Sequence, residues 1–164
     1  MGALHKGHGQ LIDFAKHAFD QENHRVLVSV FVNPLQFGPN EDFEKYPRTS
    51  EKDCELTFNS GGDAIWFPTI KQIFPEGADN YFKIQVPKKL ESYLCGQRRK
   101  GHFNGVASVL IRLINIVKPT NLILGEKDWQ QLIIIRKLIE ELNLPIRLRS
   151  CPTYRESDGL AYSS

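Results

Sequence analysis

The sequence has little cysteine, and the few cysteines are not arranged for cross-linking or metal binding. Its 164 residues include three of them, Cys54, Cys95 and Cys151, which are odd in number and far apart, with no C-x-x-C pair. This spacing argues against a disulfide framework and against a cysteine zinc site. We therefore expect a protein of a reducing compartment, the cytoplasm.

Long apolar runs and an excess of one charge are also missing. No apolar stretch approaches the ~20 residues of a membrane span, and the first residues do not form a signal-peptide pattern. The formal net charge is +2, with both signs mixed along the chain, so neither nucleic acid nor a membrane surface is predicted as a partner. There are no internal repeats, and the length predicts one domain with one core.

Strand-like and helix-like segments alternate along the chain. Apolar, β-branched runs predict strands at residues 25–32, 64–67, 82–86, 122–124 and 146–149. Helical spacing predicts helices after His8, over 50–59 with Ser50 as the N-cap, from Phe103 to before Pro119, and over 130–142. Residues 38–48 read as a long loop that could cover a site. The alternation predicts an α/β fold: a doubly wound, Rossmann-like parallel sheet with helices on both faces.

The first eight residues, Met-Gly-Ala-Leu-His-Lys-Gly-His, contain the H-x-G-H signature of nucleotidylyl transfer. Since the signature comes directly before a predicted helix, His5 and His8 would lie at a helix N-terminus, whose free N–H groups and positive dipole end favour phosphate. Gly7 leaves room for a base or phosphate against the backbone. Two imidazoles there would complement the charge that develops on an α-phosphate as pyrophosphate leaves.

Further polar clusters follow predicted strands, where such a fold places its ligands. They are Asn33-Pro34-Leu35-Gln36, residues 98–102, residues 125–131 and Ser163-Ser164. Gln36 has the donors and the acceptor to hold a hydroxy acid, and Lys127 offers a compact cation to a phosphate. Each has an ordinary alternative when taken singly: Gln36 as a loop glutamine, Lys127 and the basic run 98–100 as solvated surface, Asp128 as a helix N-cap, His102 as a structural histidine, and 46–48 as a turn.

Seven segments resemble the pantothenate synthetase (pantoate–β-alanine ligase) family, in the family's order and approximate spacing, over nearly the whole chain. These segments are MGALHKGH, SVFVNPLQFG, EKYPRT, GHFNGV, NIVKP, GEKDWQQL and RESDGLAYSS. The resemblance implies an ATP-dependent ligase that works in two steps. Pantoate attacks the α-phosphate of ATP to give pantoyl adenylate and pyrophosphate, and the amine of β-alanine then displaces AMP to give pantothenate. It also implies Mg²⁺ on the ATP phosphates and a homodimer.

The resemblance assigns roles to individual residues. It implies ATP binding by Met1, Gly2, Ala3, Leu4, His5, Lys6, Gly7, His8, Gly125, Glu126, Lys127, Asp128, Tyr154, Tyr162, Ser163 and Ser164. Among these, His8, His5 and Lys127 are the expected catalytic residues, with His8 in the proton donor's position. Substrate binding is implied for Gln36, Gln131, Asn33, Arg99 and His102. Asp53 matches a carboxylate placed near the magnesium ion.

Two departures from the family pattern shape the expected domain. In the family a strand ending in Pro-Thr precedes Met-Gly-Ala-Leu, and Arg-Asn and a smaller lid domain follow Ser-Ser. We therefore expect residues 1–164 to be the N-terminal catalytic domain that binds ATP and pantoate, without its first central strand and without the C-terminal lid domain.

Two other functions remain open at this point. One is another H-x-G-H nucleotidylyltransferase, for example one that makes a dinucleotide, although such an enzyme needs a phosphate pocket in place of the glutamines Gln36 and Gln131. The other is a non-catalytic module for nucleotide binding or dimerisation.

Overall fold

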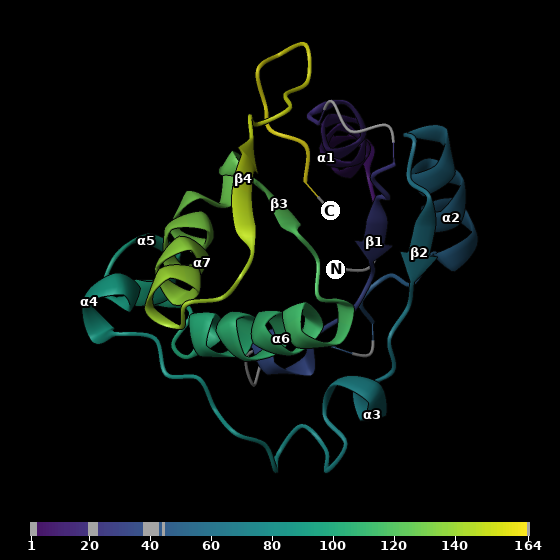
Figure 1. Ribbon diagram of the computed structural model, residues 1–164. Coiled ribbons are helices and arrows are strands. Elements are labelled where there is room, and N and C mark those ends of the chain that lie inside the picture. The colour runs from purple at the N-terminus through teal and green to yellow at the C-terminus, as the bar shows by residue number, and fades with distance from the viewer. Residues whose placement is uncertain (1–2, 20–22, 38–42, 44, 164) are drawn as a thin grey trace.

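A computed structural model describes residues 3–19, 23–37, 43 and 45–163 (Figure 1). Its elements, with 3₁₀ helices written η, are α1 (Lys6–His17), β1 (Leu27–Ser29), η1 (Pro34–Gln36), α2 (Ser50–Asn59), β2 (Ala64–Trp66), α3 (Ile70–Ile73), α4 (Lys88–Glu91), α5 (Leu94–Arg98), α6 (His102–Val117), β3 (Asn121–Gly125), η2 (Glu126–Asp128), α7 (Trp129–Glu141) and β4 (Arg147–Cys151). Among these described residues, no helix is long and apolar enough to cross a membrane.

The strands pair in parallel, which agrees with the predicted α/β class. β1 pairs with β2, with Leu27 opposite Ala64, and β3 pairs with β4, with Asn121 opposite Arg147. Within the described part of the chain these are two separate two-stranded sheets rather than one continuous sheet. β1 and β3 line opposite walls of one cavity of about 820 Å³.

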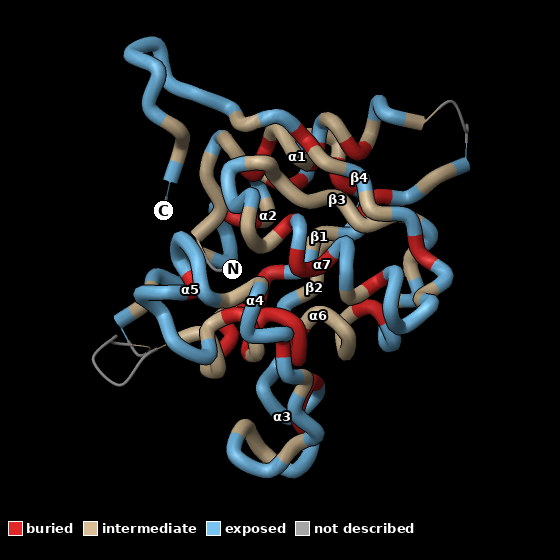
Figure 2. Tube along the Cα trace, turned by 90° about the vertical axis from the view of Figure 1, so that its left-hand side faces the viewer, coloured by how far each residue is buried: buried red, intermediate tan, exposed pale blue. Residues whose placement is uncertain are grey.

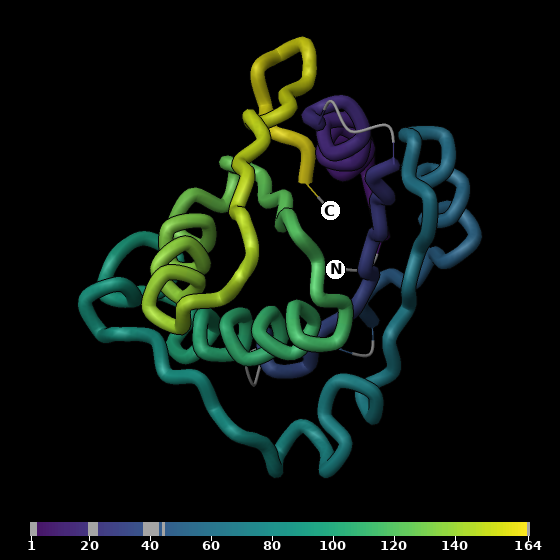
Figure 3. The backbone as a smooth tube through the Cα atoms, in the orientation of Figure 1, coloured from purple at the N-terminus to yellow at the C-terminus, as the bar shows by residue number. Residues whose placement is uncertain are grey.

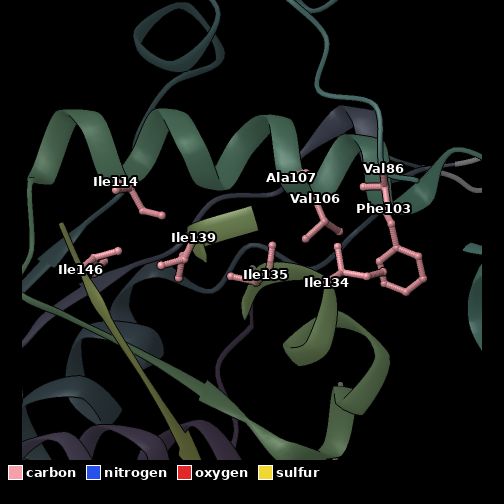
Figure 4. Close-up of a cluster of buried hydrophobic side chains, with 9 residues drawn as sticks. All are labelled: Val86, Phe103, Val106, Ala107, Ile114, Ile134, Ile135, Ile139 and Ile146. Atoms are coloured by element: carbon pink, nitrogen blue, oxygen red, sulfur yellow. The ribbon is translucent and has the colours of Figure 1, made fainter. Parts of the chain in front are cut away.

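Helices cover both faces of β3, as a doubly wound fold requires. Leu122 and Leu124 pack against the cluster that joins α6 and α7, whereas Ile123 packs against the cluster around Ile12 and Ala15 of α1. This alternation follows from the period of two in a strand. Figure 4 shows side chains of α6 and α7 meeting in the larger cluster. Alternate side chains of β3 therefore pack against the two helical layers.

Burial follows these layers. Figure 2 shows buried segments inside the body, whereas much of the chain after β4 projects from it and is exposed. One side of α6 is deeply buried, with Val106, Ala107 and Ser108 each at most 2% exposed. The apolar spacing from Phe103 predicted this helix within one residue of its observed start at His102.

The strand predicted over 82–86 is wrong. This segment runs extended along α6 without a partner strand, because side chains of the helix take its backbone donors. Ser108 Oγ accepts a hydrogen bond from the Ile84 N–H at 3.0 Å, and Asn104 Oδ1 accepts one from the Val86 N–H at 2.7 Å. A run of residues with high β propensity predicts extended backbone. It does not tell whether a partner strand or polar side chains of a helix accept hydrogen bonds from the backbone N–H groups.

Two boundaries also differ from the predictions. The strand predicted over 25–32 is reduced to Leu27–Ser29, because its partner β2 ends at Trp66 and Pro68 has no N–H to extend the ladder. The N-cap of α2 is Thr49 rather than Ser50, which is the first residue of the helix. Most of the loop predicted over 38–48 lies outside the described residues.

Candidate active site

The H-x-G-H segment opens α1, with each histidine ring capping the backbone of the same turn. His5 is the N-cap, and its Nδ1 accepts a hydrogen bond from the Gly7 N–H at 3.1 Å. His8 Nδ1 accepts one from the His5 N–H, also at 3.1 Å. A Cβ on residue 7 would lie 2.9 Å from Cε1 of His5, so a side chain at this position would push the ring away from the turn.

These contacts determine which ring nitrogens face outward. Because backbone N–H groups donate to both Nδ1 atoms, the neutral rings carry their protons on Nε2. The two rings lie side by side, with centroids 4.0 Å apart. Burial, with His5 and Lys127 nearby, lowers the pKa of His8 to about 3, and burial with Lys127 lowers the pKa of His5. At neutral pH, α1 therefore presents two uncharged Nε2–H donors.

The neutral state of His8 makes the stability of the fold depend on pH. With a pKa of 6.5 in the unfolded chain and about 3 in the fold, the unfolded chain binds the extra proton between these values. The contribution of His8 is therefore fully present above pH 6.5 and is lost as the pH falls toward 3. Between pH 7 and pH 5 we expect the free energy of unfolding to fall by about 2 kcal/mol through His8.

Urea unfolding at the two pH values measures this loss. The matched variant is His8→Asn, whose side-chain oxygen can still accept from the His5 N–H but which does not titrate. The variant is expected to lose about 2 kcal/mol less than the unsubstituted chain over this interval. Equal losses in the two proteins would contradict a buried, neutral His8.

Segments from the two ends of the chain meet beside these rings (Figure 3). The ring of Tyr162 lies 6.3 Å from that of His5 and stacks on Tyr154 at 5.3 Å, both distances between centroids. Lys127 Nζ donates a hydrogen bond to the Tyr162 carbonyl oxygen at 2.8 Å. A cation from η2 and two imidazole donors from α1 thus lie in one neighbourhood.

The cavity between β1 and β3 opens among these groups. Its lining includes ten of the residues predicted to touch ATP or pantoate. They are Leu4, His5, Gly7, His8, Gly125, Lys127, Asp128, Gln131, Tyr154 and Tyr162. Asp128 is the N-cap residue of α7 but makes no side-chain capping bond, so capping does not account for it. Pro152 and Thr153 also line the cavity, and their place directly after β4 is the signal that could have found them.

A second group of predicted residues lies where η1 docks on the start of α6. Asn33 is 3% exposed; its Oδ1 accepts from the Leu35 N–H at 3.2 Å and its Nδ2 donates to the Gly105 carbonyl oxygen at 3.2 Å. A Cβ on Gly105 would lie 2.4 Å from the Leu35 carbonyl oxygen. The close approach of η1 to α6 therefore depends on glycine at this position.

Arg99 and His102 hold the backbone of Gln36. Arg99 Nη2 donates to the Gln36 carbonyl oxygen at 3.1 Å, and His102 Nδ1 lies 3.3 Å from the same oxygen. Arg99 Nη1 lies 3.3 Å from His102 Nε2. Since the carbonyl can only accept, His102 carries its proton on Nδ1 and accepts from Arg99 on Nε2. These two residues thus position Gln36. None of this second group lines the cavity, so a shared grip by Gln36 and Gln131 stays a prediction.

Asp53 does not fit a protein-held magnesium site. It is 1% exposed, and its Oδ1 accepts from the Leu4 N–H at 2.7 Å and from Thr49 Oγ1 at 3.1 Å. Among the described residues, no group of three or more His, Cys, Asp or Glu side chains could hold a metal ion. Mg²⁺ keeps several water ligands and is bound through one or two carboxylates together with substrate phosphates. A carboxylate that is 1% exposed and accepts two hydrogen bonds on Oδ1 leaves little space for such a hydrated ion.

The remaining predicted residues are less informative. Met1, Gly2 and Ser164 lie outside the described residues. Lys6 and Ser163 are exposed and Glu126 is half-buried. Gln130, the neighbour of Gln131, has a structural part: it donates to the carbonyl oxygens of Leu90 and Tyr93 and accepts from the Gly96 N–H.

The arrangement suits the transfer of a nucleotidyl group. Neutral N–H donors and one ammonium group at a helix N-terminus can stabilise charge on phosphate oxygens, and no described side chain in the group is a nucleophile poised by a base. The chemistry available to these residues is therefore positioning and charge stabilisation.

Comparisons with known proteins agree with this chemistry. A family model described as pantoate-beta-alanine ligase matches residues 1–164. A bifunctional pantoate ligase/cytidylate kinase of Prochlorococcus marinus (strain NATL2A) is 59% identical over 164 residues, which are 100% of this chain and 32% of that protein. A protein of the same description from Synechococcus sp. (strain CC9311) is 55% identical, over 100% of this chain and 33% of its own length. The chain thus spans about a third of the length of the curated relatives it matches.

Solved structures give the same match in three dimensions. Pantothenate synthetase from Thermus thermophilus superposes with a TM-score of 0.90 at 44% identity, over 99% of this chain and 57% of that one. Pantoate-beta-alanine ligase from Francisella tularensis, complexed with beta-gamma ATP and beta-alanine, superposes with a TM-score of 0.90 at 39% identity, over 99% of this chain and 60% of that one.

Proposed function

Because the chain belongs to the pantoate–β-alanine ligase family, we propose that it binds ATP and pantoate and forms pantoyl adenylate, from which β-alanine releases AMP to give pantothenate. The observation that carries this proposal is the pair of Nε2–H donors of His5 and His8 beside the ammonium group of Lys127. These groups can hold the phosphates of ATP and stabilise the charge that develops as pyrophosphate leaves.

The chain needs no strong base for this step. Pantoate is ionised at neutral pH, since carboxylic acids titrate near 4, and its carboxylate can attack the α-phosphate directly. What the protein must supply is alignment of the two reactants, for which Gln36 and Gln131 are the proposed contacts to pantoate. Asp128 and the backbone at Tyr154 are the proposed contacts to the nucleoside.

Calorimetric titration of this chain with Mg-ATP and, separately, with D-pantoate tests the proposal. The chain is expected to bind both, and Gln36→Ala is expected to lose about tenfold or more in affinity for D-pantoate, because a neutral amide that holds a carboxylate is removed, with ATP affinity within about twofold. The matched control is Gln97→Ala, an exposed glutamine of α5, which is expected to change neither affinity.

Each other result points to a different function. ATP binding without D-pantoate binding would favour another H-x-G-H nucleotidylyltransferase. Binding of neither ligand would overturn the proposal that residues 1–164 bind them alone, and would mean that the preceding strand or the lid domain of the family is required. Equal D-pantoate affinity in Gln36→Ala and the unsubstituted chain would remove Gln36 from the proposed contacts.

The metal ion, the compartment, the oligomeric state and the domain organisation are also proposals. We propose that ATP arrives as its magnesium complex, with phosphates and water as the metal ligands, and that the protein is a cytoplasmic homodimer. The three cysteines are free, which supports a reducing compartment. The residues 1–164 are proposed as the N-terminal catalytic domain, acting with a C-terminal lid domain as in the family.

The cavity supports a place for the strand that the family has before Met-Gly-Ala-Leu. Apolar residues of β1 and of β3 line it, among them Val28 and Leu122. A parallel strand is stable only when both of its faces are covered, and α1 and α6 line the same space. We propose that a strand there completes one continuous sheet.

A further inference from the structure

We infer that Asp53 is a positioning residue for the H-x-G-H segment: its buried carboxylate holds the backbone N–H of Leu4 and so sets where α1 begins, and it does not ligate magnesium. This inference rests on the proposed function, because the segment it positions is the proposed phosphate site.

The contacts of Asp53 join two distant parts of the chain. Its Oδ1 accepts from the Leu4 N–H at 2.7 Å, across 49 residues of sequence, and from Thr49 Oγ1 at 3.1 Å. The backbone N–H of Asp53 donates to the Thr49 carbonyl oxygen at 2.8 Å. The carboxylate is thus fixed at the start of α2 and reaches across to the residue before the α1 N-cap.

The backbone of residues 4–7 explains why such a tie is needed. The His5 N–H is taken by His8 and the Gly7 N–H by His5, so the turn caps itself with the two rings that face the cavity. The next donor toward the N-terminus, that of Leu4, goes to Asp53. Ala3 has a φ of 53°, which an L-residue rarely adopts. Entry into α1 therefore depends on an external anchor.

The charge of Asp53 makes this anchor strong. A hydrogen bond from a backbone N–H to a carboxylate is shorter and stronger than one between neutral groups. At 1% exposure, the carboxylate has little water to replace a lost donor. Moving Leu4 would therefore leave buried charge with one donor fewer, so the position of Leu4, and with it of the two imidazoles, is held against displacement.

Magnesium titration separates this role from metal binding. We compare Asp53→Asn, which keeps an oxygen acceptor, with Asp53→Leu, which keeps the shape and removes every acceptor. ATP affinity is measured by calorimetry over a series of Mg²⁺ concentrations. Asp53→Leu is expected to weaken ATP binding about tenfold or more, and Asp53→Asn about threefold or less. The Mg²⁺ concentration at half-maximal ATP binding is expected to be the same in all three proteins, and D-pantoate affinity to be unchanged.

The opposite pattern would overturn the inference. A carboxylate that ligates the metal predicts that Asp53→Asn and Asp53→Leu are equally damaged and that both need about tenfold more Mg²⁺. If Asp53→Leu does not fold, Thr49→Val, which removes only the second donor, takes its place. It is expected to weaken ATP binding about threefold at an unchanged Mg²⁺ midpoint.

Asp63 supplies the matched control. Its carboxylate also accepts from a backbone N–H, that of Val26 at 2.8 Å, and pairs with Lys16 in the last turns of α1 at 3.1 Å. Asp63→Leu is expected to lower the melting temperature without changing ATP affinity. A loss of ATP affinity in Asp63→Leu equal to that in Asp53→Leu would mean general destabilisation, and would overturn a specific positioning role.

A measurement without nucleotide keeps the inference separate from the proposed function. Hydrogen exchange followed by NMR reports directly on the Leu4 amide. Its protection is expected in the unsubstituted chain and in Asp63→Leu, and it is expected to be lost in Asp53→Leu. If the unsubstituted chain does not bind ATP, the proposed function fails while this result still decides the anchor. Equal protection of Leu4 in Asp53→Leu would overturn the anchor itself.

Discussion

Replacing His8 with asparagine is expected to lower the rate of pantoyl-adenylate formation about 10²- to 10³-fold, the usual cost of removing one donor aimed at developing charge. In the unsubstituted protein His8 Nδ1 accepts a hydrogen bond from the His5 N–H at 3.1 Å. The side-chain oxygen of asparagine can take the place of Nδ1 and accept this hydrogen bond. What the variant lacks is the outward Nε2–H. Pyrophosphate release from ATP and D-pantoate measures the rate.

A second variant assigns the loss to that one proton. His8→Gln can place an amide N–H near the position of Nε2 but leaves the His5 N–H without its cap. It is therefore expected to keep more of the rate than His8→Asn and to be the less stable of the two in urea. A His8→Asn rate within about tenfold of the unsubstituted protein would rule out His8 as the main donor to the phosphates.

Replacing Gly105 with alanine is expected to destabilise the fold, because it adds a methyl group where η1 packs on α6. The added Cβ would lie 2.4 Å from the backbone oxygen and 2.8 Å from the backbone carbon of Leu35, neither of which is the end of a flexible side chain. Overpacking of about 3 kcal/mol, less the gain of about 1 kcal/mol from the better helix former, leaves a net loss of about 2 kcal/mol. The melting temperature is expected to fall by roughly 4–8 °C.

The same substitution is expected to affect pantoate more than ATP. Moving η1 away from α6 displaces Gln36, whose carbonyl oxygen is held by Arg99 and His102. Affinity for D-pantoate is therefore expected to fall about tenfold or more. The matched variant is Gly125→Ala, whose Cβ would meet Leu11 only at 3.7 Å, and which is expected to melt close to the unsubstituted chain. Equal melting temperatures for the two variants would contradict close packing of η1 on α6.

Local sequence signals predicted those parts of the fold that depend on local chemistry. The helix ending before Pro119 and the H-x-G-H turn are of this kind, because periodicity, proline and a short motif act within one or two turns of chain. The conformation of residues 82–86 does not depend on local chemistry alone. Their high β propensity gives no information on Asn104 and Ser108, which contact the segment from a helix later in the chain.

The candidate site shows the same limit. His5, His8 and Lys127 could be found because motif and position after a strand mark them. Asp53 could be matched to a family position from the sequence. Its proposed positioning role, however, depends on a contact with Leu4 across 49 residues and on the burial of its side chain, and no local sequence pattern predicts either. Pro152 and Thr153 carry no chemical signature and line the cavity only through where β4 ends.

The separation of the two sheets also bears on how cooperatively this fold opens. α1 with β1 and its cluster around Ile12 forms one packing unit, and α6, α7, β3 and β4 form another. Ile123 packs across to the first unit, and a cluster that joins Phe31 to Val109 of α6 packs between the two. Packing units that bury separate clusters open with different free energies. His8 belongs to the first unit and Lys127 to the second, so a nucleotide held by both would link them and make the two halves unfold as one.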